Sequence, residues 1–177
     1  MGSRLKPEDT TISGLKLSDL RDPAVFWASG LGVGFVRPAP GTWGSVFALA
    51  IWWLLLSELG VAAQAAVIAI YLVSAVVACQ RVCTRYGVDD ASEMVADEVV
   101  GMWLALLAAP KVWWICLIAF ALFRLIDVLK PGPVGWLDSR IKGGIGVILD
   151  DVAAGAFVCA FIWLLVASLR ALGFMII

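Results

Sequence analysis

The sequence predicts an all-α integral membrane protein, a small bundle of about five transmembrane helices, with four as the alternative, and a charged site on the cytoplasmic face. The composition is 62% hydrophobic with a mean hydropathy of +0.97, whereas a soluble domain has roughly 45–50% apolar residues. The 177 residues leave room for four or five helical crossings of about 20 residues each. Most charged residues gather in a few segments between long apolar runs.

The chain divides into a tail and one membrane domain. Residues 1–22 are polar and lack the basic-then-apolar plan of a cleavable signal, so they are expected to form a cytoplasmic tail. Residues 23–177 are expected to form a single transmembrane helical domain. Within it, residues 24–36 are rich in glycine and too short to cross, which indicates an interfacial or re-entrant segment.

The first two spans are expected to form a helical hairpin. The segment RPAPGTWGS, residues 37–45, breaks structure with two prolines and two glycines, and Thr42 or Ser45 could cap the helix that follows. The predicted spans cover residues 43–59 and 61–80.

The third crossing allows two interpretations. Residues 99–109 are apolar but too few to cross, so this helix must begin inside the acidic run at residues 89–98. If residues 95–109 instead dip into the membrane and return, the protein has four spans. The remaining spans are expected at residues 112–129 and 152–172.

The distribution of basic residues orients this layout, because cytoplasmic loops are enriched in Lys and Arg. With the N-terminus inside, two basic residues, Lys111 and Arg170, lie outside. The ten expected inside are Arg4, Lys6, Lys16, Arg21, Arg37, Arg81, Arg85, Lys130, Arg140 and Lys142. The arrangement places the RPAPGTWGS turn, the acidic run and the charged stretch at residues 123–151 on the cytoplasmic face.

Several function classes are excluded by composition. The net charge of −1 offers no field that would recruit nucleic acid, and the absence of histidine rules out an imidazole base or ligand. The four cysteines lack metal-site spacing and are expected to be reduced packing residues. Cys79 and Arg85 have the Cys-x5-Arg spacing of cysteine phosphatases, but the segment lacks glycine and is expected to be helical, so its amides are not free.

Nine of the fourteen carboxylates fall into two segments. They are Asp89, Asp90, Glu93, Asp97 and Glu98 in the first, and Asp127, Asp138, Asp150 and Asp151 in the second. If residues 90–98 are helical, Asp90, Glu93 and Asp97 share one face. Clustered carboxylate oxygens favour Mg²⁺, which commonly bridges to a substrate phosphate. The alternative is a solvated acidic loop.

Basic side chains and backbone amides near these acids suggest an anion site. Arg124, Asp127 and Lys130 share one face of a predicted span, where charges usually mark a site or pathway. The alternatives are an Arg–Asp pair that locks helices and a Lys130 that snorkels to the headgroups. The glycines after Lys142 could cradle a phosphate, and the RPAPGTWGS turn opens a helix whose N-terminus favours an anion.

Read together, these motifs resemble the bacterial phosphatidylglycerophosphatase A family in order and spacing from about residue 34 to 156. The motifs are PGTWGS at 40–45, DASEMVADE at 90–98 with Gly101, FRLIDVLKPGP at 123–133 with Asp138, GGIG at 143–146, and Asp150-Asp151 with Gly155. The departures are small: Arg37 and Ala91 stand where the family has proline, and Met94, Val134 and Val147 where it has isoleucine.

The resemblance implies Mg²⁺-dependent hydrolysis of phosphatidylglycerophosphate to phosphatidylglycerol and phosphate at the inner face of the bacterial cytoplasmic membrane. The expected metal ligands are Asp90, Glu93, Asp97, Glu98, Asp150 and Asp151. The expected catalytic residues are Asp97, Asp127, Arg124 and Lys130. The expected substrate-binding residues are Thr42, Gly44, Ser45, Arg124, Lys130, Asp138, Gly143 and Gly144. Asp127 could orient Arg124 or act as base or nucleophile.

Two other functions stay open at this point, together with the possibility of a homo-oligomer. One is an ion- or solute-translocating membrane protein, since intramembrane Arg and Asp also mark pathways. The other is a lipid phosphotransferase of the CDP-alcohol type, although the chain lacks the D-G-x-x-A-R signature expected of it.

Overall fold

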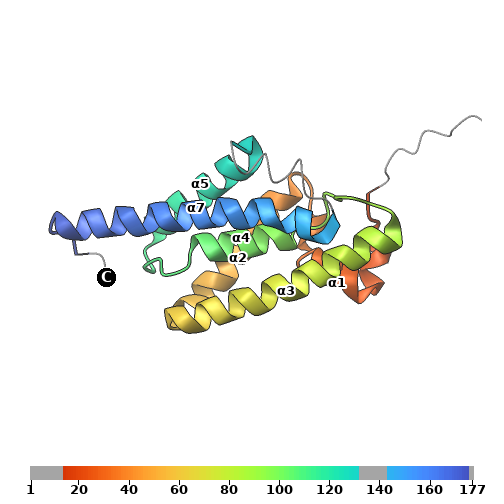
Figure 1. The fold of residues 1–177 in the computed structure, drawn as a ribbon, viewed down its shortest axis with the longest axis horizontal. Helices are drawn as coiled ribbons and strands as arrows, with labels where there is room; N and C mark the ends of the chain where they lie inside the picture. Colours follow the sequence, from red (N-terminus) through yellow and green to blue (C-terminus); the bar gives the residue numbers. More distant parts are fainter. Residues whose placement is uncertain (1–13, 132–142, 176–177) are drawn as a thin grey trace, which may run out of the picture.

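The structure of the protein, a computed structural model, describes residues 14–131 and 143–175. Every regular element among these residues is a helix (Figure 1), which confirms the all-α prediction. The elements are η1 (Leu17–Arg21), α1 (Pro23–Ala28), η2 (Val33–Phe35), α2 (Pro40–Leu54), η3 (Leu56–Glu58), α3 (Val61–Tyr86), α4 (Ala96–Ala105), α5 (Trp113–Leu129) and α7 (Gly143–Ala171).

Three segments are long and apolar enough to cross a membrane: Pro40–Glu58, Val61–Tyr86 and Gly144–Ala171. Helix α4 has 10 residues and is therefore only about 15 Å long, half of a hydrocarbon core. Helix α5 has 17 residues, or about 25 Å. The predicted bundle of five spans is thus not confirmed, and three helices meet the length requirement among the described residues.

The predicted helix limits agree best where the apolar runs have clear ends. Helix α3 begins at Val61 as expected, and α5 matches the predicted fourth span to within one residue. Helix α3 continues to Tyr86, so Cys79 and Arg85 lie in one helix and the amides between them are not available for phosphate.

Two segments fold differently from the prediction. The acidic run is not helical before Ala96, so Asp90 and Glu93 do not share a helix face with Asp97. Helix α7 begins at Gly143 rather than at residue 152, which places Asp150 and Asp151 inside the helix instead of before it. The segment expected to be interfacial or re-entrant, residues 24–36, contains only the short helices α1 and η2.

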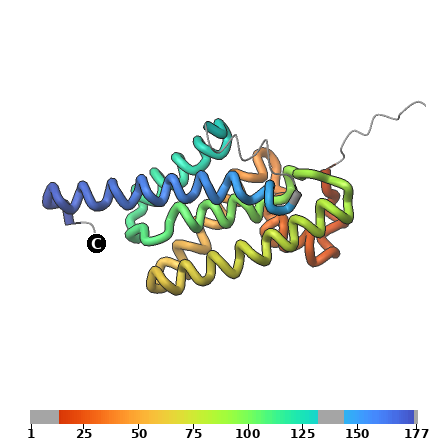
Figure 2. The backbone as a smooth tube through the Cα atoms, viewed as in Figure 1, coloured from red at the N-terminus to blue at the C-terminus, as the bar shows by residue number. Residues whose placement is uncertain are grey.

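The helices alternate in direction, and this gathers the charged motifs. The N-terminal ends of α2, α4 and α7 lie towards the same end of the bundle as the C-terminal ends of α3 and α5 (Figure 2). Buried Trp52, Met102 and Phe123 belong to a core to which α2, α3, α4, α5 and α7 all contribute. A second core, including Val25 and Val82, joins α1 to α3 beside the charged end.

The short helix α4 is held in the middle of the bundle by close packing on α7. A Cβ atom added at Gly155 would overlap the backbone carbonyl of Gly101, and one added at Gly101 would lie 2.6 Å from the Phe123 ring. Small residues that let two helix backbones approach are typical of membrane helix packing. Trp103 also donates a hydrogen bond of 2.9 Å from Nε1 to the carbonyl of Ala48 on α2. These contacts fix α4 against both neighbours.

Candidate active site

A cavity of about 510 Å³ opens at the end where the charged motifs meet. Its walls come from the first turn of α2, residues 89–92 with Met94, the start of α4, the end of α5 and the first part of α7. Among the described residues, the acidic side chains that line it are Asp89, Asp90, Asp97, Glu98, Asp127, Asp150 and Asp151, and the basic ones are Arg124 and Lys130. The carboxylates outnumber the basic groups by five, so the cavity favours cations.

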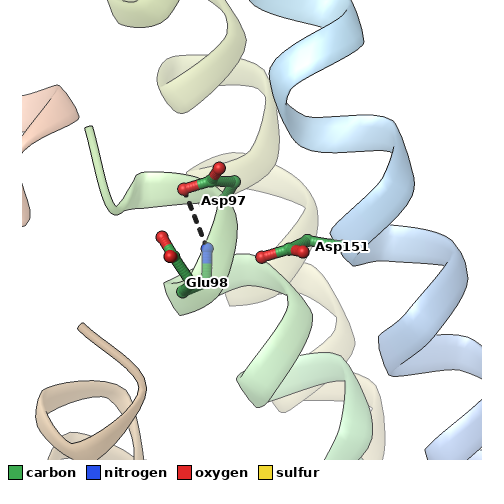
Figure 3. A group of neighbouring side chains, drawn as sticks. All are labelled: Asp97, Glu98 and Asp151. Atoms are coloured by element: carbon green, nitrogen blue, oxygen red, sulfur yellow. Dashed lines mark hydrogen bonds between the residues drawn. The ribbon is translucent and has the colours of Figure 1, made fainter. Parts of the chain in front are cut away.

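Three of these carboxylates form a tight group. Asp97 and Glu98 in the first turn of α4 and Asp151 on α7 each offer a carboxylate oxygen, and these oxygens lie within 4.8 Å of one another (Figure 3). Gly101 and Gly155, whose backbones touch, each follow one helical turn after Asp97 and Asp151. The close approach of the two glycines is therefore what brings the acids of α4 and α7 together.

Several oxygens in this region are buried without a hydrogen-bond partner among the described residues. They are Glu98 Oε2, Asp150 Oδ1 and Asp151 Oδ2, whereas Asp97 Oδ1 accepts a 3.0 Å bond from the backbone N–H of Glu98. Burial raises the pKa of the Asp97 carboxyl well above its usual range, and the nearby charge of Glu98 adds to this. Burial also raises the pKa of Glu98. Such a group of hard oxygen donors fits Mg²⁺ or a similar cation.

The two basic side chains of the cavity are held by carboxylates. Arg124 Nη1 lies 2.6 Å from Asp127 Oδ2 and 3.7 Å from Glu98 Oε1, and it donates to Ser45 Oγ at 3.4 Å. The Arg124–Asp127 pair is within α5, one turn apart, while the longer contact joins α5 to α4. Lys130, in a left-handed conformation at the end of α5, donates to Asp150 Oδ2 at 2.8 Å.

The start of α2 contributes to the site in a way that the prediction missed. The residue in contact is Gly41, where an added Cβ would overlap the Glu98 carboxylate and lie 3.2 Å from Arg124 Nη1. Thr42, Gly44 and Ser45 do not line the cavity. The prediction that Thr42 or Ser45 caps α2 is wrong, because α2 begins at Pro40 without a side-chain cap and Ser45 Oγ donates to the Gly41 carbonyl.

Three further predicted site residues have other positions. Glu93 does not line the cavity and pairs with Arg37 instead. Gly143 and Gly144 open α7, and the backbone N–H of Gly144 donates to Gln80 Oε1 at 2.9 Å, so the expected flexible phosphate-binding loop is a helix start at these positions. Asp138 lies outside the described residues.

The comparisons with known proteins agree with the motifs. The phosphatidylglycerophosphatase A family matches residues 26–166. A phosphatidylglycerophosphatase A of Haemophilus influenzae is 38% identical over 84% of this chain and 91% of its own length. One of Escherichia coli is 35% identical over 84% of each chain. A protein of Bacteroides thetaiotaomicron named putative phosphatidylinositol-3-phosphatase is 38% identical over 81% of this chain and 92% of its own.

No solved structure is a significant match. The family match nevertheless spans every element that lines the cavity, from the first turn of α2 to Asp151. The chain therefore belongs to the phosphatidylglycerophosphatase A family and is a phosphatase, an enzyme that hydrolyses a phosphoric monoester.

Proposed function

We propose that the protein hydrolyses phosphatidylglycerophosphate to phosphatidylglycerol and inorganic phosphate, with Mg²⁺, at the cytoplasmic face of the bacterial inner membrane. The observation that carries this proposal is the arrangement of the cavity. It places a group of three carboxylates, with buried oxygens left open on Glu98 and Asp151, beside the basic groups of Arg124 and Lys130. A phosphate monoester and a divalent cation together satisfy both sets of groups.

The metal would be held by Asp97, Glu98 and Asp151, with Asp90 and Asp150 on the cavity wall as further ligands. The open oxygens of Glu98, Asp150 and Asp151 support this set, because a buried carboxylate oxygen without a partner is costly. When bound, Mg²⁺ supplies positive charge that stabilises the phosphate as its charge is redistributed. Glu93 is left out of the set because both of its oxygens already have protein partners.

The phosphate side of the cavity would be formed by Arg124 and Lys130. Arg124 is held by Asp127 at 2.6 Å, which supports an orienting role for Asp127, and an oriented guanidinium can bind two phosphate oxygens at once. Lys130 adds a second positive charge next to Asp150. The N-terminal end of α2, where Gly41 lines the cavity, adds the favourable helix-dipole field for an anion.

The lipid character of the substrate is supported by the surface of the protein and by its relatives. Large apolar side chains such as Val73, Leu117 and Trp163 are more than half exposed, as expected for helices in contact with lipid. The curated relatives are named for two different lipid phosphates. The headgroup that this cavity accepts is therefore the property to measure first.

The test uses purified protein in detergent and measures phosphate release from phosphatidylglycerophosphate, with Mg²⁺ or with EDTA. Asp97→Asn and Asp127→Asn are expected to abolish most of the release, and EDTA to abolish it in the wild type. Glu58→Gln is the matched control, because Glu58 is an exposed acid in η3 that pairs with Lys111 away from the cavity. Near wild-type release by both variants, or full activity in EDTA, would overturn the metal–carboxylate proposal.

Phosphatidylinositol 3-phosphate serves as the competing substrate in the same assay. Faster release from it than from phosphatidylglycerophosphate would move the proposed substrate to that lipid. An ion- or solute-translocating function has less support, because it predicts charges along the depth of the membrane. In the described helices the charges gather at the cavity end, apart from Glu58, Lys111 and Arg170.

A further inference from the structure

Glu93 is a buried acid whose place in the structure differs from that of its neighbours. Its side chain is 3% exposed. One oxygen, Oε1, pairs with Arg37 Nη2, and the other, Oε2, accepts a hydrogen bond of 3.2 Å from the backbone N–H of Leu15. Both oxygens are thus engaged by the protein, in contrast with the open oxygens of Glu98 and Asp151.

Apart from the adjacent Ser92, whose Oγ donates to Oε1 at 3.4 Å, the hydrogen-bond partners of the Glu93 side chain belong to the N-terminal segment, residues 14–37. A Cβ atom at Gly14 would lie 2.9 Å from each Glu93 carboxylate oxygen, and one at Gly34 would overlap the Glu93 carbonyl. Arg37 also donates to Ser92 Oγ at 3.2 Å. One residue beyond Met94, the Val95 N–H donates to the Ala28 carbonyl at 2.9 Å. The N-terminal segment therefore braces the loop that precedes α4.

The other side of the same loop forms a wall of the cavity. Asp89, Asp90, Ala91, Ser92 and Met94 all line it, and Glu93 does not. These residues form no regular helix, so hydrogen bonds along their own backbone do not fix their conformation as they would in a helix. The contacts of Glu93 therefore fix the position of the loop between Asp90 and Asp97.

We propose that Glu93 is a positioning residue: through its contacts with Arg37 and Leu15 it holds the loop so that Asp90 and Asp97 reach the metal, and it does not itself bind metal. This inference rests on the proposed function, since it assigns Asp90 and Asp97 to that chemistry. It gives the N-terminal segment a role in catalysis without placing it in the cavity.

The test is a double-mutant cycle on phosphate release from phosphatidylglycerophosphate. Glu93→Gln keeps the side-chain shape and removes the charge, and Arg37→Ala removes the partner, which is 58% exposed and outside the cavity. Each is expected to lower kcat about tenfold, as loss of one hydrogen bond to a buried charge predicts. The double variant is expected to be no slower than the slower single variant, because both remove the same contact.

Two further measurements separate positioning from ligation. In an Asp90→Asn background, Glu93→Gln is expected to lower kcat by less than it does in the wild type, since one of the two residues that it positions is already changed. The affinity for Mn²⁺, measured by electron paramagnetic resonance as a stand-in for Mg²⁺, is expected to change equally in Glu93→Gln and Arg37→Ala. A loss of Mn²⁺ binding in Glu93→Gln alone, or fully additive losses of activity, would overturn the inference.

The controls keep these outcomes distinct from misfolding and from failure of the proposed function. Lys111→Ala breaks an ion pair of similar type away from the cavity and is expected to retain full activity. If Glu93→Gln does not fold, the test rests on the exposed Arg37→Ala variant. Wild-type activity of that variant would then refute the positioning role of Glu93. Failure of the wild type to release phosphate from the lipid would instead refute the proposed function.

Discussion

Two lysine–carboxylate pairs at opposite ends of the bundle have similar distances but differ in the burial of the carboxylate. Lys111 Nζ lies 2.5 Å from Glu58 Oε1, and Lys130 Nζ lies 2.8 Å from Asp150 Oδ2. The side chain of Glu58 is 66% exposed, whereas that of Asp150 is 7% exposed and leaves Oδ1 without a partner among the described residues. The distances alone do not separate the two pairs; the burial of the carboxylate does.

The difference shows where the fold contains destabilising groups. An exposed ion pair contributes about 0–1 kcal/mol and is easily replaced. A buried carboxylate with an open oxygen is destabilising unless a ligand satisfies it. The cavity end concentrates such groups on α4 and α7, and a site under this kind of strain is expected to trade stability for function.

The largest expected effect is that of Asp151→Asn at the cavity end. The change removes one charge from the three-carboxylate group, and phosphate release is expected to fall by about a hundredfold or more, a loss typical of removing a group that stabilises the transition state. The melting temperature is expected to stay the same or to rise, because like charges repel. Thermal denaturation and activity measured on the same sample test both expectations, the loss of activity and the unchanged or higher melting temperature. A lower melting temperature would contradict the comparison.

Gly155→Val tests the helix packing that brings the three carboxylates together, and leaves the carboxylates themselves unchanged. The new side chain would overlap the Gly101 carbonyl, and overpacking of this kind costs about 1–3 kcal/mol. Both the melting temperature and the activity are expected to fall, since α4 and α7 must separate. Gly173→Val is the control, because a Cβ there meets no atom within 4 Å; its left-handed backbone makes local strain at the end of α7 the only expected effect.

Lys130→Gln and Lys111→Gln form the matched pair for the comparison. Lys130→Gln removes a positive charge from the cavity and is expected to lower kcat/KM by about tenfold, the loss of one charged hydrogen bond to the phosphate. Kinetics on phosphatidylglycerophosphate and thermal denaturation of both variants provide the measurement. Equal kinetic effects from the two changes would show that the burial of Asp150, compared with the exposed Glu58, does not affect activity.

Lys111→Gln is the smallest expected effect. The Lys111–Glu58 pair is exposed on both sides, so the change in the free energy of unfolding is expected to be within about 0.5 kcal/mol. The catalytic constants are expected to match those of the wild type. A loss of activity here would indicate that the far end of the bundle communicates with the cavity.

The sequence predicted those helices whose limits are set by local signals. Gly60 precedes α3, and Pro110 and Lys111 separate α4 from α5. The starts of α3 and α5 were therefore predictable from helix-breaking residues in the sequence. The start of α7 did not follow, because the glycines at 143–146 look like a loop when read locally. In the fold Gly144 packs directly against the backbone of Gln80, a contact across 64 residues that no local pattern contains.

The site was predicted in its composition but only partly in its arrangement. Asp97, Glu98 and Asp151 were among the expected ligands, and the structure brings them together. A helix over residues 90–98 would place Glu93 on one face with Asp97, whereas in the fold its side chain turns to Leu15, a partner 78 residues away. Gly41 was visible in the PGTWGS motif, but its role depends on the neighbouring Glu98 carboxylate, which only the fold reveals.

The length of α7 bears on the route that the products would take under the proposed function. Its 29 residues extend about 43 Å, and the part after Asp151, residues 152–171, is about 30 Å long, the thickness of a hydrocarbon core. When that part fills the core, Asp150 and Asp151 lie at its edge, level with the headgroups. Under the proposed function, a lipid cleaved there would stay in its leaflet: the dephosphorylated product would leave by lateral diffusion, and the free phosphate would enter the water at that surface.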